Sequence, residues 1–302
     1  MKNFFDKLID SIESKNSHVV VGLDPRIHDI PRHILEDNQK KLGLNAKGAA
    51  SALLDFGKKI IDAVHPHAPA VKIQIAYYEY LGYWGIWAFQ ETAKYARQRD
   101  LLVIGDVKRA DISSTAQAYA EAYFQNGKTV AGSLLQSPED ASYFLDAVTL
   151  NPYFGSDSLE PFITLAHKEG KGLFILVKTS NPSSEELQDL QTANGLIYEI
   201  MAKRVHRWGE KSRGLRGYST VGAVAGATFP KAAARLRELM PNAYFLVPGY
   251  GAQGATADAL SPFFNHDGFG AIVNSSRGLI FAYNLEPYCH IYGEEDFPQA
   301  AS

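Results

Sequence analysis

Short runs of apolar residues alternate with helical patterns along nearly the whole chain of 302 residues. Each run is typical of a strand buried on both faces, because it lacks the alternation of polar residues found where a strand faces water. Buried strands that alternate with helices form a parallel sheet. We predict eight of them, near residues 18–23, 70–75, 101–106, 146–151, 172–178, 219–225, 243–247 and 270–274.

Eight strand–helix units favour a closed (β/α)8 TIM barrel, of class α/β, over an open doubly wound sheet. No linker rich in Pro, Gly and Ser divides the chain, so we predict a single domain over residues 1–302. Residues 1–16 are predicted to form an extra N-terminal helix, and the acidic end, 290–302, a frayed tail. Two segments exceed what a compact barrel needs: 126–143 has helical character, and 185–211 is predicted to be mostly helical.

Composition excludes several classes of function. The net charge of −3 gives no basic surplus for nucleic acid or anionic lipid. The first residues are interrupted by Asp6, Asp10 and Glu13, so they do not resemble a signal peptide, and no apolar run is long enough to span a membrane. The single cysteine, Cys289, precludes an intrachain disulfide and fits a reducing compartment. We therefore expect a cytoplasmic protein.

Charged residues follow the third predicted strand directly. The apolar residues 101–104 lead into Asp106, Lys108 and Asp111. Side chains alternate along a strand, so Asp106 and Lys108 should project from the same face. Such a cluster is costly to desolvate unless its members pair or contact a substrate. The alternative is a surface ion pair at the start of a helix.

Polar residues end the other predicted strands as well. In a barrel, the carboxyl ends of all strands meet at one mouth, so these residues should converge. Lys72 lies within an otherwise apolar strand and needs a counter-charge, which Asp106 on the neighbouring strand could supply. A lysine that extends outward between helices is the alternative. The strand ends carry Asp24, Lys72, Asp106 with Lys108, Asn151, Ser180, Thr228, residues 249–253, and Arg277.

The last two strands are followed by a predicted phosphate site. The loop PGYGAQG begins near Gly249 and includes Gln253, and its glycines let backbone N–H groups approach an anion closely. The segment NSSRG then places Ser276 and Arg277 at the start of a helix, which suits a dianion. Barrels often bind phosphate after these two strands.

A metal site is not predicted. His65 and His67 are close in sequence, but no Cys, Asp or Glu lies beside them at ligand spacing. They also precede a strand, which places them at the end of the barrel away from the mouth.

Several motifs together resemble one family. GDVKRADISST carries the D-x-K-x-x-D signature of the orotidine 5′-phosphate decarboxylases, and VGLDPR, VKIQIAYYE, VKTSNPS, VPGYGAQG and NSSRG match that family's motifs in order. The likeness covers most of the chain. The length and the DPR and NPYFG segments are most similar to the longer bacterial branch of the family.

The resemblance implies a reaction, decarboxylation of orotidine 5′-phosphate to uridine 5′-phosphate in pyrimidine biosynthesis, without a cofactor or metal. It implies an alternating charged array of Lys72, Asp106, Lys108 and Asp111 around the scissile carboxylate. Lys108 would be the general acid that protonates C6 of the pyrimidine. Asp106 would lie near the substrate carboxylate and be oriented by Lys72.

The resemblance also implies substrate contacts and a homodimer. Asp24 and Lys72 would hold the ribose hydroxyls, and Ser180 would recognise the amide edge of the pyrimidine. Gln253 and Arg277, in the two loops that contain Gly249 and Ser276, would hold the phosphate. Asp111 and Thr115 would reach the active site of the partner subunit.

Three alternatives remain open. A related barrel decarboxylase that forms an enediolate would require Mg²⁺ and further acidic ligands, whereas Lys72 stands where one of those would be. An aldolase would form a Schiff base on Lys72 or Lys178. A non-catalytic barrel would bind the nucleotide but lose little when Lys108 is replaced.

Overall fold

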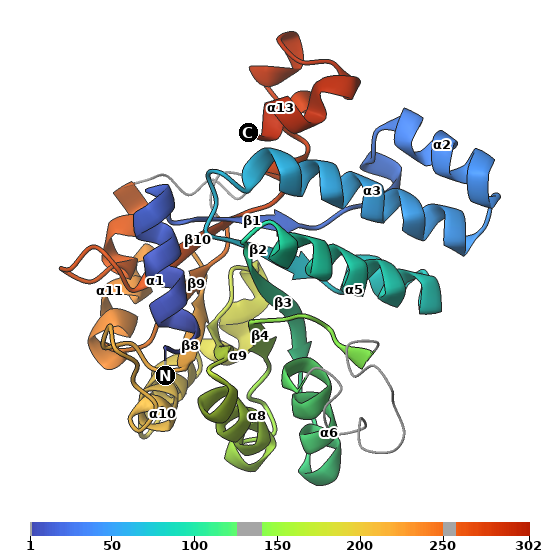
Figure 1. Ribbon diagram of the computed structural model, residues 1–302. Coiled ribbons are helices and arrows are strands. Elements are labelled where there is room, and N and C mark those ends of the chain that lie inside the picture. Colours follow the sequence, from blue (N-terminus) through green and yellow to red (C-terminus); the bar gives the residue numbers. More distant parts are fainter. Residues whose placement is uncertain (1, 126–140, 250–257) are drawn as a thin grey trace.

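The structure is a computed structural model that describes residues 2–125, 141–249 and 258–302. Eight parallel strands close into a barrel in the order β1-β10-β9-β8-β5-β4-β3-β2 (Figure 1). Each predicted strand overlaps one of them, so the predicted (β/α)8 barrel is confirmed. The strands are β1 (Val19–Leu23), β2 (Ala70–Gln74), β3 (Leu102–Arg109), β4 (Ala147–Leu150), β5 (Gly172–Lys178), β8 (Val221–Ala225), β9 (Phe245–Val247) and β10 (Ala271–Ser275).

Helices surround the barrel and connect its parallel strands (Figure 1). The chain begins with α1 (Phe4–Lys15), and a separate pair, α2 (Arg32–Leu42) and α3 (Ala46–Val64), follows β1. Within the described residues, the further α-helices are α4 (Ala76–Glu79), α5 (Gly82–Gln98), α6 (Ser113–Phe124), α8 (Ser156–Glu169), α9 (Glu185–Gln188), α10 (Ile197–Gly209), α11 (Pro230–Leu239), α12 (Arg277–Ile280) and α13 (Phe297–Ala301).

The N-terminal helix α1 closes the amino-terminal end of the barrel. A capping box starts it, in which Asn3 and Asp6 each accept a hydrogen bond from the other's backbone N–H. Phe4 and Phe5 are fully buried and belong to the same apolar cluster as the inward-facing side chains of the strands. A Cβ at Gly172 would lie 2.4 Å from the Phe4 ring, so glycine lets this ring pack against β5. The plugged end leaves the opposite end of the barrel for a site.

A second apolar shell separates the strands from the helices. Outward-facing residues such as Val71, Val103 and Ile175 are fully buried there. The strands are therefore covered on both faces, as their continuous apolar sequence predicts.

The prediction of a frayed tail at 290–302 is wrong for the last helix. α13 packs against α3 (Figure 1), and Phe297 is buried with its ring stacked on Phe56 at 5.1 Å between centroids. Glu294 also accepts a hydrogen bond from the backbone N–H of Arg32. The acidic composition suggested a solvated end, but a single aromatic side chain anchors the segment to the core.

The two longer segments have different outcomes. In 185–211, a small antiparallel hairpin of β6 (Gln191–Thr192) and β7 (Gly195–Leu196) separates α9 from α10, so the segment is helical at both ends but not throughout. Most of 126–143 lies outside the described residues. Among the helices described, none has the length and apolar character needed to cross a bilayer.

Candidate active site

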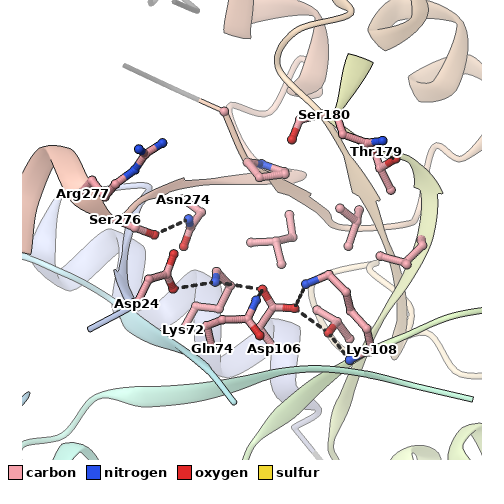
Figure 2. A pocket seen from close by; sticks show the side chains of 17 residues that line it. Asp24, Lys72, Gln74, Asp106, Lys108, Thr179, Ser180, Asn274, Ser276 and Arg277 are labelled. Atoms are coloured by element: carbon pink, nitrogen blue, oxygen red, sulfur yellow. Dashed lines mark hydrogen bonds and ion pairs between the residues drawn. The ribbon is translucent and has the colours of Figure 1, made fainter. Parts of the chain in front are cut away.

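A pocket of about 490 Å³ opens at the carboxyl ends of the strands (Figure 2), a size suited to a small-molecule ligand. Eight of the predicted site residues line it together: Asp24, Lys72, Asp106, Lys108, Ser180, Gly249, Ser276 and Arg277. Polar residues that the sequence analysis did not single out for the site also line it: Gln74, Thr149, Thr179, Asn181 and Asn274. Gln253 lies outside the described residues.

An alternating row of charges forms the floor of the pocket. The Lys72 ammonium lies 2.9 Å from Asp106 Oδ2 and 3.5 Å from Asp24 Oδ1, and Lys108 Nζ lies 2.5 Å from Asp106 Oδ1. The predicted pairing of Lys72 with Asp106 is thus confirmed, and the outward-facing alternative is excluded. Lys72 is buried, whereas the Lys108 side chain is 46% exposed and open to a ligand.

Lys72 and Asp106 keep their charges at neutral pH. Burial alone would lower the pKa of Lys72, but the negative charges of Asp106 and Asp24 outweigh burial and raise it. Burial would likewise raise the pKa of Asp106, but the Lys72 and Lys108 ammonium groups outweigh it and lower the pKa. The pocket therefore holds a buried carboxylate between two cations.

Two uncharged side chains complete the shell around Asp106. Thr149 Oγ1 donates to Oδ1 at 2.8 Å, and Gln74 Nε2 donates to Oδ2 at 2.9 Å. Each carboxylate oxygen thus accepts one hydrogen bond from a lysine and one from a neutral donor. Gln74 lies two residues after Lys72, so strand alternation could have predicted its direction, whereas Thr149 is an ordinary strand residue and gives no comparable signal.

The backbone at Lys108 is locally unusual. β3 shifts register against β4 between Gly105 and Arg109, and Lys108 has a φ of 44°, in the left-handed region. Its backbone N–H donates to Thr149 Oγ1 at 3.0 Å, which helps to hold this conformation. A non-glycine residue there costs about 1–3 kcal/mol and is found mostly where function requires it. Thr149 thus positions both the carboxylate and the lysine.

One end of the pocket is formed by Gly249, Ser276 and Arg277, the end at which the sequence predicts phosphate binding. Asn274 Nδ2 donates to Ser276 Oγ at 3.1 Å, which orients this hydroxyl (Figure 2). A Cβ at Gly22 would lie 1.9 Å from Ser276 Oγ, so glycine on β1 leaves the space that the serine occupies. Ser180 and Thr179 lie on the opposite side of the pocket (Figure 2). A ligand with an anionic and a polar end can therefore span the charged row.

Two predicted residues do not line this pocket. Asp111 is half-buried and accepts a hydrogen bond from the Ile112 N–H at 2.8 Å, and Thr115 is exposed in the first turn of α6. Asn151, which has no predicted role, accepts a hydrogen bond from the Tyr153 N–H at the carboxyl end of β4. The chain by itself brings neither Asp111 nor Thr115 to the charged row.

One group in the described residues combines three potential metal ligands within 4.8 Å of one another: Glu286, Cys289 and His290. All three are exposed, and none lines the pocket. His65 and His67 are not in this group.

Comparison with known proteins identifies the family of this chain. The model of a family described as "Orotidine 5'-phosphate decarboxylase / HUMPS family" matches residues 17–287. A protein of Caldicellulosiruptor bescii named orotidine 5′-phosphate decarboxylase is 42% identical over 284 residues, which cover 94% of this chain and 91% of that relative. The protein of the same name from Rhodopirellula baltica is 39% identical over 300 residues, or 99% of this chain and 95% of the relative.

A solved structure extends the likeness to three dimensions. The Leishmania donovani OMP decarboxylase matches with a TM-score of 0.71 and 32% identity, covering 99% of this chain and 97% of that one. Family model, relatives and structure all span nearly the whole barrel, including every strand that contributes to the pocket. The chain therefore belongs to the orotidine 5′-phosphate decarboxylase / HUMPS family.

Proposed function

We propose that the protein converts orotidine 5′-phosphate to uridine 5′-phosphate and CO2, as a carboxy-lyase (EC 4.1.1.23) of pyrimidine biosynthesis. One observation carries the proposal: a buried carboxylate, Asp106, lies between Lys72 and Lys108 at the floor of the pocket. The names of the relatives support the same reaction. A cytoplasmic location fits a chain with the single cysteine Cys289.

The pocket suggests how the substrate lies. Its phosphate would meet Arg277, Ser276 and the loop that begins at Gly249, with Gln253 of the same loop as a further contact. The ribose would lie over Asp24 and Lys72, which are within 3.5 Å of each other. The pyrimidine would then extend toward Ser180, with its carboxylate over Asp106 and its C6 beside Lys108.

The chemistry follows from this placement. The bond between C6 and the carboxylate carbon breaks, its electron pair stays on C6, and CO2 leaves. No conjugated electron sink stabilises this vinyl carbanion, so a fixed cation must do so. Lys108 supplies that cation and then transfers a proton from Nζ to C6, and the exposed amine regains a proton from solvent. Departure of CO2 also removes a negative charge from beside Asp106.

We also propose a homodimer with shared active sites, in which Asp111 and Thr115 reach the partner's pocket. Large apolar side chains are exposed in the segments that follow β2, β3 and β4, which are neighbouring strands of the barrel. They include Tyr83, in the first turn of α5, and Ile112 and Tyr153, which are 75%, 50% and 77% exposed. Such side chains are typical of a surface that a second subunit covers.

The alternatives fit the charges less well. In a Mg²⁺-dependent decarboxylase, Asp24 and Asp106 would be candidate ligands, but both are paired with the Lys72 ammonium. A Schiff base requires a neutral amine, whereas the pKa of Lys72 is raised by its two carboxylate neighbours against the effect of burial. Lys178, the other candidate for a Schiff base, is buried and paired with Asp189.

The direct test mixes chelator-treated protein with orotidine 5′-phosphate and follows the loss of orotate absorbance. The parent should turn over, and Lys108→Ala should be nearly silent while it still binds uridine 5′-phosphate. Lys94→Ala, which changes a lysine of helix α5 away from the pocket, is the matched control and should behave like the parent. Inactive parent protein that gains activity with Mg²⁺ and a sugar-phosphate acid would overturn the proposal, as would a borohydride-trapped adduct.

A further inference from the structure

The pocket wall formed by residues 179–181 is connected to a second set of contacts behind it. Thr179, Ser180 and Asn181 line the pocket directly after β5 ends. The chain then turns through α9 and returns, so that Gln188 and Asp189 lie against Thr179 and Lys178. We call these four residues, Lys178, Thr179, Gln188 and Asp189, the β5 clasp. Gln188 and Asp189 do not line the pocket.

The first half of the clasp is an ion pair. Lys178 is almost fully buried, and its Nζ lies 2.7 Å from Asp189 Oδ1 and 3.3 Å from Ser184 Oγ. The ammonium also lies over the Phe229 ring, 4.1 Å from its centroid. A buried ammonium is costly without a counter-charge, so Lys178 strongly favours the conformation in which Asp189 folds back onto it.

The second half is a pair of hydrogen bonds from one glutamine. Gln188 Oε1 accepts from the Thr179 backbone N–H at 2.9 Å, and its Nε2 donates to Thr179 Oγ1 at 2.8 Å. The Thr179 hydroxyl in turn donates to Asn181 Oδ1 at 2.7 Å. Gln188 thus fixes both the backbone and the side chain of Thr179, and through it Asn181.

The other side of the wall is held by the loop after β8. Thr228 Oγ1 donates to the Ser180 carbonyl at 3.2 Å, and the Gly226 N–H donates to the Lys178 carbonyl at 2.8 Å. A Cβ at Gly226 would lie 2.8 Å from Ser180 Cα, so the two backbones are in close contact. Ser180 is therefore held between this loop and the clasp.

We propose that Gln188 and Asp189 are positioning residues that set the base-binding wall of the pocket, and through it the selectivity for the pyrimidine. The proposal rests on the proposed function only for the identity of the ligand. Neither residue touches the substrate; they act through Thr179, Ser180 and Asn181. The phosphate and ribose ends, built on β1, β2, β9 and β10, do not depend on the clasp.

The test compares a ligand that has the base with one that lacks it. Binding of uridine 5′-phosphate and of ribose 5-phosphate is measured by calorimetry for the parent, for Gln188→Ala, and for Gln191→Ala. Gln191 is an exposed neighbour on the hairpin whose side chain donates to the Thr192 carbonyl and does not line the pocket, which makes it the matched control. Gln188→Ala should weaken uridine 5′-phosphate about tenfold, the value of one to two lost hydrogen bonds, and leave ribose 5-phosphate unchanged.

A second variant guards against a general loss of structure. Asp189→Asn keeps an acceptor for Lys178 but removes the charge, so it should reproduce the selective loss more mildly, with an unchanged far-UV circular dichroism spectrum. Equal weakening of both ligands by Gln188→Ala, or of neither, would overturn the proposal. A parent protein that binds both ligands but does not decarboxylate orotidine 5′-phosphate would instead contradict the proposed function and leave the clasp intact.

Discussion

Thr149 makes two contacts at the centre of the site, and it carries no charge of its own. Its hydroxyl donates to Asp106 Oδ1 and accepts from the Lys108 backbone N–H. Hydrogen bonds to the charged form of a carboxylic acid lower its pKa, so this hydroxyl acts in the same direction as Lys72 and Lys108. A single neutral side chain thus supports the ionisation of the acid and the conformation of the lysine beside it.

We predict that Thr149→Val lowers kcat/KM about tenfold near neutral pH, since a hydrogen bond to a charged group contributes about 1.5–3 kcal/mol. Lys72 and Lys108 still hold the pKa of Asp106 well below its usual range in this variant, so Asp106 stays charged. The deficit should therefore be similar at every pH near neutrality. Steady-state rates across the pH range measure this.

Two controls separate this effect from a packing change. Thr149→Ser keeps the hydroxyl and should restore most of the activity. Thr164→Val makes the same substitution at an exposed position of α8 and should be neutral. Full activity of Thr149→Val would show that Lys72 and Lys108 hold Asp106 without this hydroxyl.

The charged residues of the site were predictable because their chemistry conflicts with their surroundings. A lysine within an apolar strand, such as Lys72, requires an explanation, and the barrel topology supplies its partner on the next strand. Thr149 raises no such conflict, because threonine is common in strands. Gln188 and Asp189 belong to a polar stretch of sequence, and nothing local indicates that the chain folds back onto Lys178.

At the scale of elements, the strands were predictable because each is an apolar run covered on both faces. The carboxyl-terminal end of the chain was not. Phe297 is one aromatic residue in an acidic segment, and its burial against Phe56 depends on where α3 lies. The β6–β7 hairpin, in contrast, has a local signal, the pair Asn194–Gly195, with Gly195 at a φ of 111°. Long-range packing therefore decided the end of the chain, whereas the hairpin was predictable from its own residues.

Arg237 connects several segments at the amino-terminal end of the barrel. Its guanidinium donates to the carbonyls of Phe263, Met240, Ala243 and Gly270 and lies over the Phe245 ring, 3.7 Å from its centroid. These carbonyls belong to the segments that enter β9 and β10. Burial lowers its pKa to about 10, so the group stays charged at neutral pH.

We predict that Arg237→Met lowers the free energy of unfolding by about 3 kcal/mol, because several buried carbonyls lose their donor. The free energy of unfolding of Arg237→Lys should lie between those of the parent and Arg237→Met, since one ammonium cannot reach all four oxygens. Urea unfolding followed by circular dichroism measures the change. The kcat of the folded variant should equal that of the parent, because the pocket lies at the other end of the barrel; a reduced kcat would show coupling between the two ends.

At the scale of the whole molecule, one chain brings Lys72, Asp106 and Lys108 of the predicted array into the pocket, but not Asp111. Asp111 projects from the loop after β3 without entering the pocket of its own chain. The exposed Ile112 follows it directly, and the exposed Tyr83 and Tyr153 lie in segments that follow the neighbouring strands β2 and β4. A second copy that covers these side chains would accept Asp111 and Thr115 in its pocket. Its own Asp111 and Thr115 would lie in the pocket of the first copy.

Mixed dimers test this arrangement. Lys108→Ala and Asp111→Ala should each be nearly inactive alone. In a mixed dimer with shared sites, one site carries both substitutions and the other carries neither. Random assortment of equal amounts, by co-expression, should therefore restore about a quarter of the parent activity, because half of the dimers are mixed and each has one intact site.

The matched control co-expresses Lys108→Ala with Asp106→Ala. Both residues belong to the same chain's pocket, where they lie 2.5 Å apart, so every site in a mixed dimer keeps one defect and no activity should return. Light scattering reports whether the mixtures are dimeric. Dimers without recovery in the first mixture would assign Asp111 to its own chain, and active monomers would remove the shared site altogether. Recovery only when Lys108→Ala is mixed with Asp111→Ala would mean that each pocket requires Asp111 of the partner subunit.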